Sequence, residues 1–328
     1  MKDGLIKWGI VGCGAVTEKK SGPAFNKVPN SSLMAVMRRD AEKAEDYAKR
    51  HGVPRWYSDA EKLIADPEVN AIYIATPPDS HLPYTRMALE AGKPVYVEKP
   101  MALNVASAEI MQQLAAQFED RVVVAHYRRN WPKFKKVKQL LDEGAIGKPV
   151  SANLQYFRVP LTAEEMQQSG VQWRINPAIS GGGLFHDLAP HQFDLFLYWL
   201  GNVYHAAGTS MNVGGLYDAP DMVSGTLQFE SGVSFTGDWC FCAQDNQQKD
   251  QWEIVGEKGR ISGSVFWEAD IKLESENGIQ SFSFQPAEHN QIYHIEEVVK
   301  FFRGEAPNPC SAKDGFKVMK WMEAFSGI

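Results

Sequence analysis

Residues 6–17 read IKWGIVGCGAVT, an apolar run of strand type that passes directly into two closely spaced glycines. The segment is close to the pattern G-x-G-x-x-G, in which glycines let the backbone turn tightly against a pyrophosphate at the start of a helix. Thr17 stands at the third small position, so we expect helix and strand to pack less closely there. Gly12, Gly14, Ala15 and Val16 are candidate cofactor-binding residues, and an ordinary strand-to-helix turn is the alternative.

The chain around this segment alternates short β-branched runs with longer segments of helical period. We expect strands at residues 6–11, 33–37, 71–75, 95–97 and 122–125, and helices that include 41–50 and 82–90. Such alternation is typical of a parallel sheet covered by helices. The glycine segment after the first strand then favours an α/β, doubly wound Rossmann domain over residues 1–125 that binds a dinucleotide.

The expected second strand ends in Arg38 and Arg39, where many dinucleotide-binding domains carry an acid for the ribose hydroxyl of NAD. Two guanidinium groups suit the 2′-phosphate of NADP and offer nothing to a neutral diol. NADP is therefore the favoured cofactor, with NAD as the alternative. A solvated arginine pair beside the next helix is the structural explanation that competes with both.

Lys99 follows the apolar strand around residues 95–97 and precedes Pro100. In an open parallel sheet, ligands bind beyond the carboxyl ends of the strands, so an ammonium there could hold a hydroxyl or polarise a carbonyl. An ordinary surface lysine is the alternative. The isomer of the Lys99–Pro100 bond is open at this stage, since X-Pro bonds adopt both forms.

After Pro149 the pattern changes to alternating strands joined by hairpin turns such as Asn277-Gly278. We expect strands at 150–159, 203–213, 223–230, 233–241, 251–255, 260–266, 271–276 and 280–284, and helices at 133–141, 188–200, 292–302 and 312–325. The second domain, residues 126–328, is thus expected to be α+β with a large, open, mostly antiparallel sheet. Lys133 and its neighbouring lysines are expected on the solvated face of their helix.

The segment SGGGLFHDLAPHQFD, residues 180–194, brings three glycines to the start of a helix expected at 188–200. Pro190 fits such a helix only in its first turn. Asp187, His191 and Asp194 are spaced to share one helix face, where carboxylates could orient His191 as a general acid or base. The alternatives are that Asp187 caps the helix and that His191 is structural. No second element supplies ligands at a recognisable spacing, so no metal site is expected.

Composition narrows the remaining classes of function. The 328 residues include 40 acidic and 34 basic side chains, a formal net charge of −6, which disfavours nucleic acid and anionic membranes as partners. The four cysteines are too sparse for a disulfide scaffold and indicate a cytoplasmic protein with reduced thiols. No secretory leader and no apolar run long enough to span a bilayer are expected.

The motifs together resemble the glucose-fructose oxidoreductase and inositol dehydrogenase family of NAD(P)-dependent oxidoreductases. The resemblance extends from Ile6 to the last helix, and its most specific parts are Glu98-Lys99-Pro100 and the triple-glycine segment ending in Asp187 and His191. It implies a Rossmann domain followed by a domain whose open sheet often forms a homodimer or higher homo-oligomer.

The resemblance also implies roles for single residues. Lys99, Asp187 and His191 would be catalytic, with lysine and aspartate holding the reacting oxygen and histidine exchanging its proton. The residues implied to contact the cofactor are Thr76, Pro77, His81, Glu98, Lys99, Trp173 and Arg174. Substrate contacts would come from the catalytic three together with Tyr127 and Arg128, positions at which many family members carry other polar residues.

The leading hypothesis is an enzyme that moves a hydride between the nicotinamide and a secondary alcohol or ketone of a sugar or polyol. Trp131, Tyr156 and Trp239 are candidates to stack on a sugar face, although a core position is the favoured interpretation for each. A second enzyme hypothesis is reduction of non-sugar carbonyls or oxidation of trans-dihydrodiols. A regulator that senses NADP without turnover is the alternative from another class, although such a protein would be free to lose Lys99 or His191.

Overall fold

The computed structural model describes residues 4–328, and the chain divides into two compact units. The first unit runs to Arg128 and also takes in Ala287–Lys317, whereas the second comprises Arg129–Pro286 and Val318–Ile328. The first unit is therefore not one continuous stretch of chain, because a late segment, residues 287–317, belongs to it as well. Residues 1–3 of the expected first domain lie outside the described residues.

The first unit contains a six-stranded sheet, and its paired strands are all parallel. In spatial order the strands are β3 (Arg55–Tyr57), β2 (Ser31–Met37), β1 (Ile6–Val11), β4 (Ala71–Ile74), β5 (Val95–Val97) and β6 (Val122–Val124). The order 3-2-1-4-5-6 is that of a doubly wound dinucleotide-binding fold, and it confirms the predicted fold class. The prediction missed β3, a three-residue edge strand with two exposed residues.

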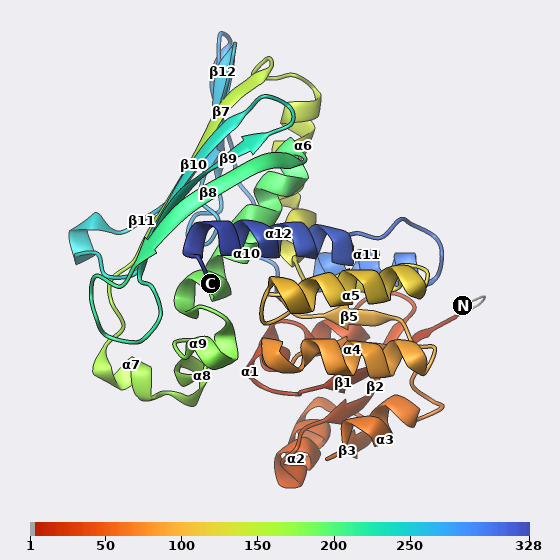
Figure 1. The fold of residues 1–328 in the computed structure, drawn as a ribbon. Helices are drawn as coiled ribbons and strands as arrows, with labels where there is room; N and C mark the ends of the chain where they lie inside the picture. Colours follow the sequence, from red (N-terminus) through yellow and green to blue (C-terminus); the bar gives the residue numbers. More distant parts are fainter. Residues whose placement is uncertain (1–3) are drawn as a thin grey trace. The chain divides into compact units, whose positions relative to one another are not determined.

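Helices cover both faces of this sheet, as the colours and labels of Figure 1 show. Neighbouring residues of β1 point to opposite faces, and Trp8 packs on Phe25 and Phe302 while Gly9 lies under Leu63. The helical segments of this unit are α1 (Ala15–Lys19), η1 (Gly22–Asn26), α2 (Ala41–His51), α3 (Ala60–Ala65), η2 (Pro78–Ser80), α4 (His81–Glu90), α5 (Val105–Gln117) and α11 (Ile292–Phe302).

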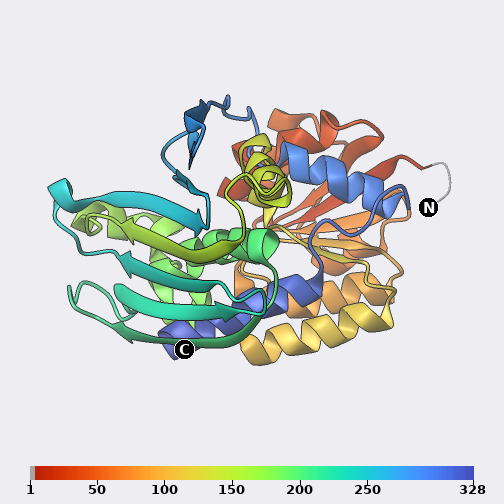
Figure 2. The same ribbon diagram turned by 90° about the horizontal axis from the view of Figure 1, so that it is seen from above.

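The second unit is built on an eight-stranded sheet, seen in Figure 2 as neighbouring green to blue ribbons. In spatial order the strands are β14 (Gly278–Phe282), β13 (Ile271–Ser275), β12 (Gly259–Gly263), β11 (Lys249–Gly256), β7 (Pro149–Phe157), β10 (Ser234–Cys240), β9 (Met222–Phe229) and β8 (Val203–Met211). All neighbours are antiparallel except β7 and β10. The large, mostly antiparallel sheet was predicted correctly.

Helix α10 (Gly183–Leu200) packs on one face of this sheet through aromatic side chains. Phe196 lies 4.6 Å from Phe235 of β10, and Trp199 lies 4.7 Å from Trp252 of β11, between ring centroids. The other helical segments are α6 (Pro132–Asp142), α7 (Ala163–Gln167), α8 (Ser169–Gln172), α9 (Pro177–Ser180) and η4 (Asp245–Gln247). Two more helical segments cross the boundary between the units, η3 (Tyr127–Asn130) and α12 (Ala312–Ser326).

Two predictions for the second unit are wrong. Helix α10 begins at Gly183 rather than 188, so Pro190 lies inside the helix and Asp187 does not cap it. The sequence did not indicate this start, because glycine is a poor helix former, yet here glycines form the turn and Gly183 is the first helical residue. Lys133 is buried rather than solvated, because its ammonium donates to the carbonyl oxygens of Ser264, at 2.6 Å, and Glu268. Among the helices of residues 4–328, none combines the length and the apolar composition that a membrane span requires.

Candidate functional site

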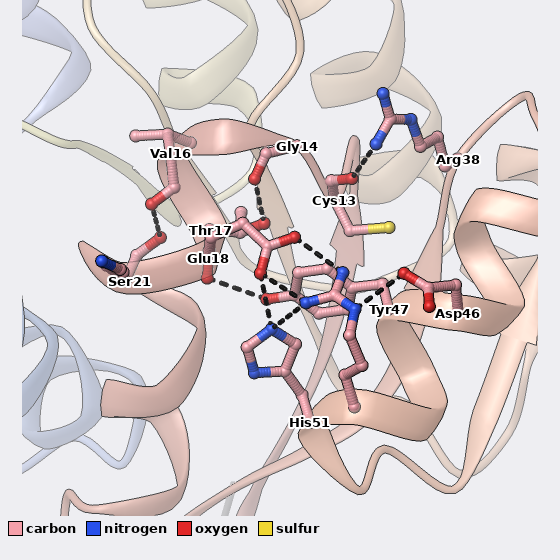
Figure 3. Close-up of polar contacts among 12 residues, drawn as sticks. Cys13, Gly14, Val16, Thr17, Glu18, Ser21, Arg38, Asp46, Tyr47 and His51 are labelled. Atoms are coloured by element: carbon pink, nitrogen blue, oxygen red, sulfur yellow. Dashed lines mark hydrogen bonds and ion pairs between the residues drawn. The ribbon is translucent and has the colours of Figure 1, made fainter.

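The glycine turn after β1 presents bare backbone at Gly14, which Figure 3 draws beside Cys13 and Thr17. Gly12 has φ +94, and a Cβ there would lie 2.7 Å from Cγ2 of Thr76, so the position excludes other residues. Gly14 precedes α1, and the nearest atom to a Cβ built there is the Gly12 oxygen at 3.9 Å. Ala15 and Val16 then begin the helix. This turn fits a pyrophosphate approached by bare backbone.

Thr17 stands at the third small position of the motif, and both its hydroxyl and its carbonyl oxygen form hydrogen bonds. Its hydroxyl donates to the Gly14 carbonyl at 2.9 Å, and its own carbonyl accepts from Tyr47 Oη at 2.8 Å. The close approach occurs instead at Gly22, where a Cβ would lie 2.2 Å from both the Thr17 oxygen and Tyr47 Oη. Gly22, the first residue of η1, thus allows a close approach to the backbone of Thr17.

Arg38 lies beside the glycine turn, at the end of β2. Its Nη1 points to the Cys13 carbonyl oxygen at 3.5 Å, as Figure 3 shows. Arg38 is half-buried, whereas Arg39 is exposed and belongs to the turn before α2. Burial raises the pKa of the Cys13 thiol to about 11, against the opposing effect of Arg38, so this side chain remains a neutral packing residue.

A cluster of charged side chains ties α1 to α2 below the turn. Arg50 donates to both carboxylate oxygens of Glu18 at 2.9 Å, and Nε2 of His51 lies 2.8 Å from the same carboxylate. These hydrogen bonds, first of all that of Arg50, lower the pKa of Glu18 to about 2. Asp46 accepts from Arg50 Nε at 2.7 Å and completes the cluster.

Glu98, at the end of β5, is held by a buried network. Its Oε1 accepts from Tyr73 Oη and from Gln291 Nε2, both at 2.5 Å. Gln291 in turn accepts from Tyr96 Oη at 2.7 Å. Burial, followed by the charge of Glu98, raises the pKa values of both tyrosines, so these phenols remain hydrogen-bond donors. The late segment of the chain thereby fixes a carboxylate next to Lys99.

Lys99 follows in a half-buried position, and the Lys99–Pro100 bond is cis. Its backbone nitrogen donates to Glu98 Oε2 at 3.3 Å. His81 is fully buried, with Nδ1 3.1 Å from the Pro100 oxygen and Nε2 2.8 Å from the Thr76 oxygen. Burial lowers the pKa of His81, and its two ring nitrogens connect the segments that follow β4 and β5. Pro77 lies between β4 and η2 in the same region.

In the second unit, the three glycines form a tight turn into α10. Ser180 Oγ accepts from the backbone nitrogen of Gly183 at 2.9 Å, which satisfies the start of the helix. Gly182 is indispensable, because a Cβ there would lie 2.0 Å from Nδ1 of His186. Burial lowers the pKa of His186 to about 4, so this histidine is neutral and packs against the turn.

The two carboxylates predicted to share one face of α10 with His191 bind different arginines. Asp187 accepts from Arg174 Nε at 2.9 Å, and the Arg174 guanidinium also covers the Trp173 ring at 4.6 Å. Asp194 is bound by the buried Arg129, whose Nε donates across 3.1 Å. Asp194 is therefore part of a structural ion pair, a contact that its spacing from His191 did not reveal.

His191 is buried on α10, and its ring lies edge-on to Phe266 with 6.0 Å between centroids. Tyr127 and Arg128 are buried in η3, where the Arg128 guanidinium lies 5.6 Å from the Tyr127 ring. Of the three aromatic candidates for a sugar face, Tyr156 and Trp239 occupy core positions instead, at 2% and 0% exposed, and Trp131 is half-buried.

Several residues that shape these regions carried no signal in the sequence. Gln291 lies far along the chain from its carboxylate partner Glu98, and a polar residue without a motif gives no indication of such pairing. For Arg174, the family resemblance implies a contact with the cofactor and does not indicate its ion pair with Asp187. Within the described part of the chain, no three His, Cys, Asp or Glu side chains are placed to hold a metal ion.

Comparison with known families gives two matches that together cover most of the chain. Residues 6–126 match a model described as an oxidoreductase family with an NAD-binding Rossmann fold. Residues 134–262 match the GFO/IDH/MocA C-terminal domain.

Individual relatives extend the likeness over nearly the whole length. Oxidoreductase P35 of Formosa agariphila is 44% identical over 322 residues, 98% of both chains. The 1,5-anhydro-D-fructose reductase of Ensifer adhaerens is 27% identical over 236 residues, 70% of this chain and 67% of the relative. A solved oxidoreductase from Thermotoga maritima, 27% identical, aligns with a TM-score of 0.85 over 97% of this chain and 95% of that one.

Proposed function

This chain belongs to the GFO/IDH/MocA family of oxidoreductases, and we propose that it interconverts a secondary alcohol and a ketone of a sugar or polyol. The similarity to an anhydrofructose reductase supports this class of substrate. Reduction of a non-sugar carbonyl or oxidation of a trans-dihydrodiol is the alternative that a substrate panel would reveal. A regulator without turnover is disfavoured, because Lys99, Asp187 and His191 are all present.

The observation that carries this proposal is the arrangement on α10. Asp187 and His191 lie one helical turn apart, and Arg174 holds the Asp187 carboxylate at 2.9 Å. A carboxylate and an imidazole on one helical face can bind a hydroxyl and exchange its proton. The ion pair gives the carboxylate a defined position, which a general acid–base site requires.

We assign the proton transfer to His191 and the holding of the reacting oxygen to Lys99 and Asp187. The ammonium of Lys99 would stabilise negative charge that develops on the oxygen as its proton leaves. A bound nicotinamide would accept the hydride in the oxidation and supply it in the reduction. Tyr127 and Arg128 are the further residues proposed to contact substrate.

For the cofactor we propose NADP, with NAD as the alternative. Gly12, Gly14, Ala15 and Val16 would surround the pyrophosphate, and Arg38 and Arg39 would pair with the 2′-phosphate. The half-buried Arg38, next to the open glycine turn, supports this choice, since a guanidinium fork matches phosphate oxygens. The nicotinamide half is proposed to lie near Thr76, Pro77, His81, Glu98 and Lys99, with Trp173 and Arg174 adding contacts.

The test is a panel of aldoses, inositols, anhydro-sugars, diones and trans-dihydrodiols, followed by nicotinamide absorbance with NADPH or NADP. We expect turnover of a cyclic sugar or polyol, and a fall in kcat of roughly 10²- to 10⁴-fold in His191→Asn with cofactor binding nearly unchanged. A fully active variant would contradict the assignment of His191. Cofactor binding without turnover of any compound would favour the regulator.

We also propose a cytoplasmic homodimer formed through the large sheet. Tyr204 and Met211 of β8 are 71% and 57% exposed, which is apolar surface that a second copy would cover. The four cysteines are free thiols, in keeping with a reducing compartment. Light scattering of the purified protein tests the dimer, and a monomer at micromolar concentration would contradict it.

A further inference from the structure

The segment of residues 264–268, between β12 and β13, is fixed to the sheet by a buried carboxylate. Asp250 of β11 is 4% exposed and accepts hydrogen bonds from the Ser264 hydroxyl and from three consecutive backbone nitrogens. The nitrogens are those of Val265 at 3.1 Å, Phe266 at 2.6 Å and Trp267 at 2.9 Å. A carboxylate that binds three successive N–H groups leaves this turn little conformational freedom.

The same segment is fixed from its other side by a buried lysine. Lys133 of α6, 4% exposed, donates to the carbonyl oxygens of Ser264 and Glu268, the two ends of the segment. The Ser264 hydroxyl also accepts from the backbone nitrogens of Trp267, at 2.9 Å, and Glu268, at 3.1 Å. Donors and acceptors of the turn are thus bound on both sides, which is typical of a rigid element rather than a mobile loop.

This rigid turn carries two adjacent aromatic side chains, Phe266 and Trp267, which continue a series of ring contacts that starts at His191. The ring of Phe266 lies 6.0 Å from the His191 ring and 5.1 Å from that of Tyr156, between centroids. Trp267 lies 6.0 Å from the same tyrosine and remains 49% exposed, although Tyr156 itself is 2% exposed. A continuous aromatic row therefore begins at the proposed acid–base residue and ends in an indole open to solvent.

We propose that Phe266 and Trp267 form the apolar wall of the substrate site and select ring-shaped over open-chain polyols. The inference rests on the proposed function, because it takes His191 as the group that meets the reacting hydroxyl. A sugar ring in its closed form presents a persistent face of C–H groups, which an aromatic ring buries favourably. An open-chain polyol has no such persistent face, because rotation about its C–C bonds turns its hydroxyl groups in many directions.

The experiment compares Trp267→Ala and Trp267→Phe with the wild-type enzyme on closed and open substrates. The closed probes are 1,5-anhydro-D-glucitol, myo-inositol and D-xylose, and the open probe is D-glucitol. We expect Trp267→Ala to raise KM for the closed probes roughly tenfold with little change in kcat, and Trp267→Phe to restore most of the loss. The KM for D-glucitol should change little.

Trp56 provides the matched control, because it is also half-exposed, at 40%, and lies on the edge strand β3, which β2, β1 and β4 separate from β5 in the sheet. Trp56→Ala should leave every KM unchanged. Equal KM values for closed probes in Trp267→Ala and wild type would overturn the inference, as would a wild-type enzyme that turns over only open-chain polyols. A wild-type enzyme that turns over no compound of the full panel contradicts the proposed function, and the inference falls with it.

Discussion

Arg174 donates from Nε to the Asp187 carboxylate across 2.9 Å, and this ion pair joins the segment after α8 to the start of α10. The guanidinium is 32% exposed and the carboxylate 17%, so the pair is partly shielded from water. Such a pair holds a carboxylate in one orientation more firmly than solvent does. Arg174 is thereby a positioning residue for a proposed catalytic group.

Replacing Arg174 by alanine should therefore lower kcat by roughly 10- to 100-fold, because Asp187 would no longer hold the reacting oxygen in place. Stopped-flow or steady-state kinetics would measure the loss. Arg174→Lys should recover only part of it, since an ammonium cannot reproduce the guanidinium geometry. A double variant with Asp187→Asn should lose little beyond the larger single effect.

The outcome also distinguishes two roles for this arginine. If Arg174 acts through Asp187, the dissociation constant for NADPH stays nearly constant while kcat falls. A large rise in that constant with unchanged kcat would instead indicate the cofactor contact that the family resemblance implies.

Arg38 and Arg39 should contribute unequally to the choice of cofactor. Arg38 is half-buried against the glycine turn and Arg39 is exposed, so Arg38→Ala should weaken NADPH binding by roughly 10- to 100-fold and Arg39→Ala by less. Binding of NADH should hardly change in either variant. Fluorescence titration would measure all four constants, and equal losses for the two cofactors would contradict a 2′-phosphate contact.

The first unit could be predicted well because its information is local. In α2, for example, the Asp40 side chain caps the first turn and Gly52 ends the helix in the left-handed conformation, so residues next to the helix specify both of its ends. The packing of residues 287–317 on this unit could not be predicted, because the pairing of Gln291 with Glu98 joins residues 193 positions apart. Only tertiary contact specifies it.

In the second unit, the helical pattern located charged side chains correctly along the helices but did not indicate their hydrogen-bond partners. Helical spacing placed Asp194 on the face of His191, but the buried Arg129 takes that carboxylate. Similarly, an apolar stripe suggested that Lys133 is solvated, although carbonyl oxygens of residues 264 and 268 attract it into the interior. Periodicity describes one helix by itself and contains nothing about what a neighbouring turn offers.

The ion pair between Glu18 and Arg50 predicts a dependence of stability on acid. The folded-state pKa of Glu18 is about 2, below the ordinary value of 4.5 for a glutamate, so its contribution to stability is present above pH 4.5 and is lost as pH falls toward 2. Because both side chains are partly exposed, we expect Glu18→Gln to cost only about 0.5–1 kcal/mol at pH 7. Urea unfolding at pH 7 and pH 3 would measure it.

The loss should be smaller at pH 3, where the wild-type carboxylate has begun to lose its advantage. Glu45 offers the control, since it forms an exposed pair with Lys49 within the same helix at 3.0 Å. Glu45→Gln should change stability less than Glu18→Gln does at pH 7. Equal effects of the two variants at both pH values would contradict a special role for Glu18.

The pair of Arg129 and Asp194 should govern stability rather than chemistry, because the side chains are only 8% and 1% exposed. Removing one partner leaves a buried charge without compensation, so Asp194→Asn should lower the free energy of unfolding by about 3–5 kcal/mol. The double variant Arg129→Met with Asp194→Leu removes both charges and should recover much of that loss. Urea unfolding would measure the free energies, while kcat of the folded enzyme should stay close to wild type. A stable Asp194→Asn protein with impaired kcat would instead return Asp194 to the catalytic face on which its spacing first placed it.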